Sequence, residues 1–184
     1  MKHRTQFILA GGLILLVIVS IARVAAEEKS HKSTTVSMRK MADSLHAIIV
    51  ADQQVYSEKA APHSGQTNGL PGHAQVLRLA AQRIQTAGAE FSYTLRSLTP
   101  VNPNQGPQTD AEKAGLEHTA KNPEDPYYSE ELLGGRSYFT AVYPYRATLP
   151  ACANCHNQEP RSPRHDFKTN DVLGGIIIRI PLEF

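Results

Sequence analysis

The chain has 184 residues, of which 41% are hydrophobic and 20% are charged, a balance that indicates a packed core rather than global disorder. This length suits one domain of ordinary size with a short terminal segment. The formal net charge is +2, but Lys2, Arg4 and Arg23 lie near the N-terminus, which leaves 16 of the 19 basic side chains against 17 acidic ones. The sequence shows no basic face, so nucleic-acid binding is not expected.

An apolar run follows a positive flank at the N-terminus. Residues 7–22 read FILAGGLILLVIVSIA after the basic residues at 2–4. Such a segment inserts into the cytoplasmic membrane with its charged end inside. The run approaches the ~20 residues that span a bilayer, which favours a retained anchor, although the small residues before position 27 also fit a signal-peptidase site. We therefore predict an anchor or signal peptide at 1–26 and a domain at 27–184. That domain would lie at the periplasmic face of the cytoplasmic membrane, or be soluble in the periplasm if the leader is cleaved.

Two helices are predicted next. Hydrophobic residues recur every three or four positions from Ser33 to about Ala60, and the Ser33-Thr34-Thr35 cluster can cap the start of this helix. It begins so soon after the apolar run that the two segments could be continuous. Glycines and prolines at 61–73 indicate a connecting loop. A second helix is expected over Ala74–Ala87, with Gly88 as its C-terminal cap.

The hydrophobic period then changes to two. Apolar and polar side chains alternate at 91–96, as in a half-buried strand. Thr109 followed by Glu112 resembles a capping box and predicts a short helix to about Ala120.

Further strands are expected towards the C-terminus. Gly134-Gly135 indicates a hairpin turn into an aromatic strand over 136–145. A continuous apolar run within 171–183 predicts a central strand buried on both faces. Leading helices followed by a mostly antiparallel sheet define the α+β class.

The only two cysteines stand in the sequence Cys152-Ala153-Asn154-Cys155-His156. Paired thiols with a following histidine form the attachment sequence of a c-type haem, in which the thiols bind covalently and the imidazole binds iron. A thioredoxin-like pair would stand in a βαβ unit, a zinc site would need a distant fourth ligand such as His165, and a bare disulfide leaves His156 unexplained. The motif therefore predicts one covalent haem c, attached at Cys152 and Cys155, with His156 as the proximal ligand of the haem iron.

The order of these features resembles a family of bacterial single-haem c-type domains with a PAS-like fold. Its members occur alone and as extracytoplasmic sensor parts of chemoreceptors and histidine kinases. The matching stretches cover nearly all of residues 34–184: VYSEKAAP, EFSYTLRSLTPVNPNQGP, GGRSYFTAVYPYR, PACANCHN and SPRHDFKTNDVLGGIIIRIPL. The resemblance implies a five-stranded antiparallel sheet with helices, covalent haem, and a role in redox or small-ligand sensing or in electron transfer. No output segment follows Phe184, so a signal would pass to a separate partner.

The sixth position of the iron is open to several side chains. A second protein ligand there suits electron transfer, whereas an open position admits a diatomic ligand. Some members of the resembled family place a side chain of the first helix there, and aligning VYSEKAAP gives Tyr56 as the distal-pocket candidate. Met41 and His46, earlier on the same helix, are further candidates.

Aromatic residues and loop histidines complete the candidates. Tyr93, Tyr138 and Phe139 are candidates for the haem wall, although aromatic side chains on strands are ordinarily core residues. Three other histidines fall in predicted loops, where we expect them to be solvated: His63, His73 and His165.

The sequence thus predicts a membrane-associated, extracytoplasmic haem c module that senses redox state or a diatomic gas. It would work with a redox partner or a separate signalling protein. A small electron-transfer cytochrome is the alternative. An enzyme such as a peroxidase is the least favoured, because no distal His-Arg pair is apparent.

Overall fold

The computed structural model describes the backbone of residues 2–60 and 72–182, and the side chains of residues 20, 21, 23–59 and 72–182. The chain forms two compact units, Met1–Ser37 and Met38–Phe184, and the first helix, α1 (Lys2–Ala60), contributes to both. Among the described residues, no helix has the length and apolarity needed to cross a membrane. Most side chains of the apolar run at 7–22 lie outside those residues.

The predicted start of the first helix at Ser33 is wrong, because α1 is already helical from Lys2. The hydroxyls of Thr34 and Thr35 each donate, over 3.1 Å, to the backbone carbonyl four residues earlier. Threonines inside helices bond in this way, whereas a cap would accept from backbone N–H groups ahead of it. The apolar run and the following helix are thus continuous.

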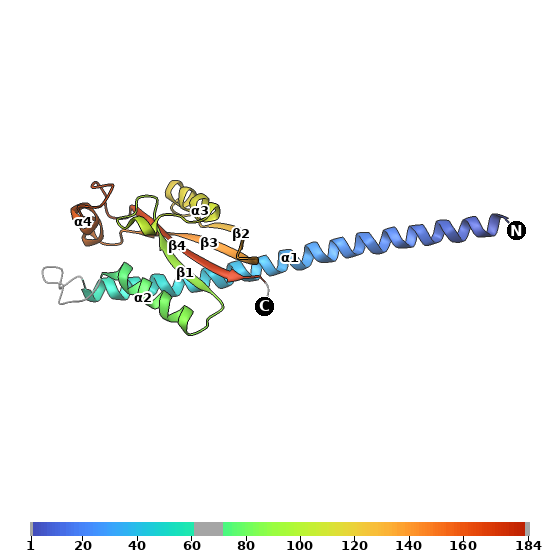
Figure 1. Ribbon diagram of the computed structural model, residues 1–184, viewed down its shortest axis with the longest axis horizontal. Coiled ribbons are helices and arrows are strands. Elements are labelled where there is room, and N and C mark those ends of the chain that lie inside the picture. The colour runs from blue at the N-terminus through green and yellow to red at the C-terminus, as the bar shows by residue number, and fades with distance from the viewer. Residues whose placement is uncertain (1, 61–71, 183–184) are drawn as a thin grey trace. The chain divides into compact units, whose positions relative to one another are not determined.

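The rest of the fold is one antiparallel sheet with three further helices and a short 3-10 turn. The sheet order is β1-β4-β3-β2, with α3 on one face and α1 and α2 on the other (Figure 1). This confirms the α+β class, while the described residues form four strands and not the five that the resemblance implied. The elements are α2 (His73–Thr86), β1 (Ser92–Arg96), η2 (Pro103–Gln105), α3 (Asp110–Lys121), β2 (Tyr127–Leu133), β3 (Arg136–Arg146), α4 (Pro150–Gln158) and β4 (Val172–Pro181).

Residues that favour turns and helix caps mark the ends of several strands and helices. Gly134 and Gly135 have φ values of 59° and 82°, so the two-residue turn between β2 and β3 requires the left-handed conformation that glycine adopts freely. At the start of α3, Thr109 Oγ1 accepts from the Glu112 N–H over 3.1 Å, as predicted. The Glu112 carboxylate reaches back to the N–H of Gln108 over 2.6 Å, one residue beyond the position expected for a capping box.

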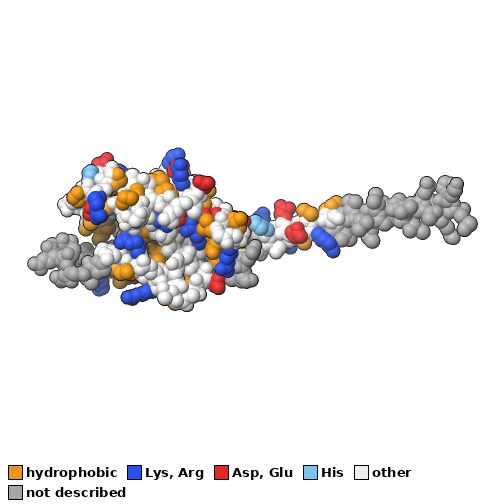
Figure 2. Space-filling view, viewed as in Figure 1, with side chains coloured by type: hydrophobic (Ala, Val, Ile, Leu, Met, Phe, Trp, Pro, Cys, Tyr) orange, Lys and Arg blue, Asp and Glu red, His pale blue; other side chains and the backbone are white. Residues whose placement is uncertain are grey.

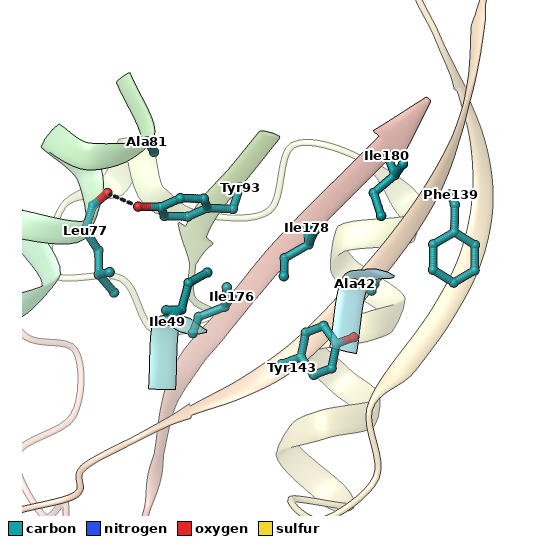
Figure 3. Close-up of a cluster of buried hydrophobic side chains, with 11 residues drawn as sticks. Ala42, Ile49, Leu77, Ala81, Tyr93, Phe139, Tyr143, Ile176, Ile178 and Ile180 are labelled. Atoms are coloured by element: carbon teal, nitrogen blue, oxygen red, sulfur yellow. Dashed lines mark hydrogen bonds between the residues drawn. The ribbon is translucent and has the colours of Figure 1, made fainter. Parts of the chain in front are cut away.

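The strand β4 forms the centre of the core. Ile176, Ile178 and Ile180 point to the face covered by α1 and α2, where they join a cluster that includes Leu77 of α2 (Figure 3). Ile177 points to the opposite face and packs with Leu116 of α3 and with Val142. The predicted central strand, buried on both faces, is confirmed, and each of these fully buried side chains contributes about 1.5–3 kcal/mol.

The end of β3 leads directly into the motif helix α4. A small separate core holds this helix at the end of the sheet, and Tyr145 and Cys152 pack against it. Its buried members are Ala147, Ala153, Phe167 and Leu173. The last residues of β3 and the first turn of α4 are therefore fixed relative to each other.

Candidate functional site

Both cysteines of the motif lie on α4. Cys152 is partly buried, Cys155 is exposed, and neither is in a disulfide. Residues three apart on a helix lie on the same side, so both thiols can reach one planar group. The helix connects the antiparallel strands β3 and β4, which is not the βαβ context of a thioredoxin-like pair.

His156 lies in the last turn of α4. Its ring meets the ring of Phe167 edge to face, with 5.6 Å between the ring centroids. Burial lowers the pKa of His156 from its ordinary value. The imidazole is therefore neutral at neutral pH, and a neutral imidazole is the form that binds metals.

A recess of about 70 Å³ lies beside His156. Its walls come from α2, from the end of β1 and the loop after it, from Tyr145 of β3 and from the start of β4; residues that line it include Ala74, Arg78, Leu95, Val101, Tyr145 and Leu173. Preformed ligand pockets measure about 300–1,000 Å³, so this recess is too small to hold a porphyrin in the structure described. A second recess, of about 790 Å³, lies between α3 and β2 and contains no cysteine or histidine.

His73 connects Tyr145, which lines the recess, to Asp52 on α1, and the sequence did not predict these contacts. His73 Nδ1 lies 3.1 Å from Tyr145 Oη, and His73 Nε2 lies 3.4 Å from Asp52 Oδ2. The His73 side chain is only 9% exposed. The expectation that it is a solvated loop residue is wrong, because His73 begins α2 and is covered by its two partners.

The other loop histidines differ from His73. His165 is exposed, as expected, and its Nδ1 lies 2.8 Å from the backbone oxygen of Asn157. His63 lies outside the described residues.

The first-helix candidates are spread along α1. The centroid of the Tyr56 ring lies 5.3 Å from that of His73. Met41 is exposed. His46 stacks on Tyr143, with the ring centroids 4.0 Å apart. None of these three candidates lines the recess beside His156.

The candidate haem-wall residues belong to the sheet. Tyr93 and Phe139 are members of the main core, and the Tyr93 hydroxyl donates to the backbone oxygen of Leu77 over 3.0 Å. Tyr138 lies beside the guanidinium of Arg136, 5.9 Å from the ring centroid. The recess beside His156 is lined instead by Tyr145, which the sequence reading did not single out.

Comparison with known proteins identifies the family. The model of the Tll0287-like family matches residues 28–181. The chain belongs to the Tll0287-like family. The match confirms the resemblance found in the sequence. Among solved structures, this Tll0287-like chain is similar to the crystal structure of the cyanobacterial heme-protein Tll0287, at 16% identity over 76% of this chain and 95% of that chain, with a TM-score of 0.45. No curated protein matches it.

The side chains on α4 of this Tll0287-like protein are the donor set that a covalently held haem would use, although the recess beside His156 is smaller than a porphyrin. Two thiols on one side of α4 and a neutral imidazole in its last turn are the donors that a c-type haem uses. Arg78 lines the recess and carries a positive charge there. Within the described residues, no cluster of three or more His, Cys, Asp or Glu side chains is arranged to hold a metal ion by itself.

Proposed function

We propose that the chain carries one haem c and works as a membrane-associated, extracytoplasmic sensor of redox state or of a small ligand. The observation that carries the proposal is the arrangement on α4, where Cys152, Cys155 and His156 share one short helix and His156 faces a recess. When bound, the haem supplies an iron that changes oxidation state and takes up small ligands.

The side chains of α4 have separate roles in this proposal. Cys152 and Cys155 form the thioether bonds that attach the haem, and His156 is the proximal iron ligand. The small core around Phe167 holds the helix, so the imidazole is oriented before the haem arrives. Arg78, which lines the recess, would supply a positive charge for a haem propionate.

Sequence features support the location. The positive flank and apolar run at the N-terminus are typical of a segment that delivers the following domain across the cytoplasmic membrane. Free thiols would oxidise in the periplasm, and covalent attachment to haem there removes both of them. In Figure 2 the described surface carries positive and negative side chains on the same face.

Covalent attachment is tested by producing the full chain with haem-attachment machinery and extracting it with acidified acetone. The unaltered protein should keep its haem and give the pyridine haemochrome spectrum of a c-type haem. When both Cys152 and Cys155 are replaced with alanine, the extraction should remove all of the haem. Asn154→Ala, an exposed change between the two cysteines, is the matched control and should retain haem. Release of haem from the unaltered protein would contradict the proposal.

Electron transfer is the second candidate function, because the exposed Cys155 places one attachment point at the surface, where a redox partner can approach. The two functions differ at the sixth iron position. Uptake of a small ligand by the holoprotein at micromolar concentration supports sensing. A strong-field six-coordinate spectrum in both oxidation states, with no ligand uptake, supports electron transfer instead.

A further inference from the structure

The strand β2 lies at one edge of the sheet, where β3 is its only neighbour among the described residues (Figure 1). It pairs with β3 in one continuous register from Tyr127 to Leu133. In an antiparallel ladder, every second residue turns its N–H and C=O groups away from the neighbouring strand. The outer side of β2 therefore presents a row of backbone donors and acceptors about 24 Å long.

The two edges of the sheet differ in their protection against an added strand. Short length, proline, bulges and charged side chains are the usual protection. β1 has five residues, and the loop after it folds back, because the Ser97 N–H donates to the Gln105 carbonyl over 2.9 Å. β2 has seven residues, YYSEELL, with no proline or bulge, and its charges are those of Glu130 and Glu131. Within the described part of the chain, β2 is thus the edge that another strand can pair with.

The recess of about 790 Å³ lies beside this edge. Every residue of β2 except Tyr128 lines it, and its opposite wall consists of residues 107–111, 113 and 114, at the start of α3 and just before it. Its volume is in the range of preformed ligand sites, about 300–1,000 Å³. Leu132, one of the lining residues, is 69% exposed although it is hydrophobic. An extended segment in this recess would pair with the backbone of β2 and cover Leu132.

The charges at this recess select the kind of segment that fits. The charged side chains that line it are Asp110, Lys113, Glu130 and Glu131. Arg179 neutralises Glu131 over 2.8 Å, whereas Glu130 is exposed at the middle of β2. Opposite charges that face each other across paired strands are favourable, and like charges are unfavourable. A second copy of β2, paired antiparallel over its full length, would place its own Glu130 opposite this one, so the edge disfavours self-pairing and favours a basic segment.

We propose that the outer edge of β2 binds an extended, positively charged segment of a partner protein as an added strand. A lysine or arginine of that segment lies opposite Glu130, on the sheet face that Tyr128 and Leu132 share with it. The residues on either side of this basic residue point to the other face, towards the start of α3. In this mode of recognition main-chain hydrogen bonds give affinity and alternate side chains give specificity. The inference concerns a partner of the chain and does not depend on haem attachment.

The test measures the binding of synthetic peptides to the purified full chain by isothermal titration calorimetry. The probe is an end-blocked, seven-residue peptide of alternating lysine and valine, and its counterpart has glutamate in place of lysine. The lysine peptide should bind about three- to tenfold more tightly, because its charge opposes that of Glu130. Glu130→Lys should reverse this preference. Glu117→Lys, at an exposed position of α3 that does not line the recess, is the matched control and should keep it.

Methylated peptides test the backbone pairing separately. In a paired strand the N–H groups that face one neighbour belong to alternate residues. Methylating the nitrogens of all lysines and methylating those of all valines should therefore have unequal effects: one peptide should lose binding and the other should keep it. The amides of β2 should also exchange hydrogen more slowly when the unmethylated lysine peptide is bound.

Several results would overturn the inference. They are the absence of binding by the lysine peptide, an equal response of Glu130→Lys and Glu117→Lys, and an equal effect of the two methylation patterns. A dimer of the unaltered chain that the lysine peptide dissociates would assign the edge to a second copy and would also overturn it. None of these results bears on covalent haem, so failure of this inference and failure of the proposed function are distinguishable.

Discussion

His46 on α1 makes the stability of the fold depend on pH in a way that one substitution should remove. Its ring stacks on Tyr143, and its buried Nε2 has no hydrogen-bond partner. Burial lowers the pKa of His46 to about 4, and the negative charge of Asp43 opposes this shift only in part. The substitution His46→Phe preserves a stacked ring and removes the titrating group.

Proton linkage gives the direction and the size of this change in stability with pH. The unfolded chain binds a proton at His46 near pH 6.5, and the folded protein resists it until about pH 4, so stability falls as the pH drops through that window. At about 1.4 kcal/mol per pKa unit the full shift corresponds to about 3 kcal/mol. Because the ring is only partly buried and water screens it, we expect a loss of about 1–2 kcal/mol at pH 4.5.

Urea denaturation followed by circular dichroism at pH 7.5, 6.5, 5.5 and 4.5 measures the effect. The difference in unfolding free energy between His46→Phe and the unaltered protein should grow by about 1–2 kcal/mol as the pH falls from 7.5 to 4.5. His31→Phe, at an exposed position of the same helix, is the control and should show no such trend. A difference that stays constant with pH would refute the reasoning.

Two further substitutions test how the sheet is covered. Gly115→Ala should destabilise the protein by about 1–3 kcal/mol in urea melts, because the added Cβ would overlap Val142 Cγ2. Ala114→Ser, at an exposed neighbouring position, should be nearly neutral. Glu112→Gln should lower the free energy of unfolding by about 3–5 kcal/mol. The Glu112 side chain is 1% exposed and lies 2.8 Å from the guanidinium of Arg179 and 3.5 Å from that of Arg96. Glu117→Gln on the exposed side of α3 is its control, and equal melting of the two variants would contradict the assignment.

Features set by neighbours in the sequence could be predicted, because local chemistry decides them. The Gly134-Gly135 pair favours a tight hairpin turn, and the isoleucine run of β4 favours a strand buried on both faces. The predicted start of α1 at Ser33 was wrong because Ser and Thr occur both as helix caps and inside helices. In the structure the hydroxyls of Thr34 and Thr35 donate to backbone carbonyls four residues earlier in the helix.

The candidate site also contains one part that the sequence predicts and one part that it does not. The attachment motif is contiguous, so spacing alone indicates its chemistry. The three residues linked by hydrogen bonds beside the recess are far apart in the sequence: Asp52 lies 21 residues before His73, and Tyr145 lies 72 residues after it. No pattern of apolar residues or turns connects positions so far apart, and His73 therefore looked like a loop histidine. Only the folded position of His73, between Asp52 of α1 and Tyr145 of β3, brings the three together.

The most direct test of the central claim is the intact mass of the full chain after maturation in a periplasm equipped for haem attachment. Our account predicts that the mass under denaturing conditions exceeds that of the polypeptide by one haem, and that replacing Cys152 and Cys155 with alanine abolishes the increase. A mass equal to that of the polypeptide alone would contradict it.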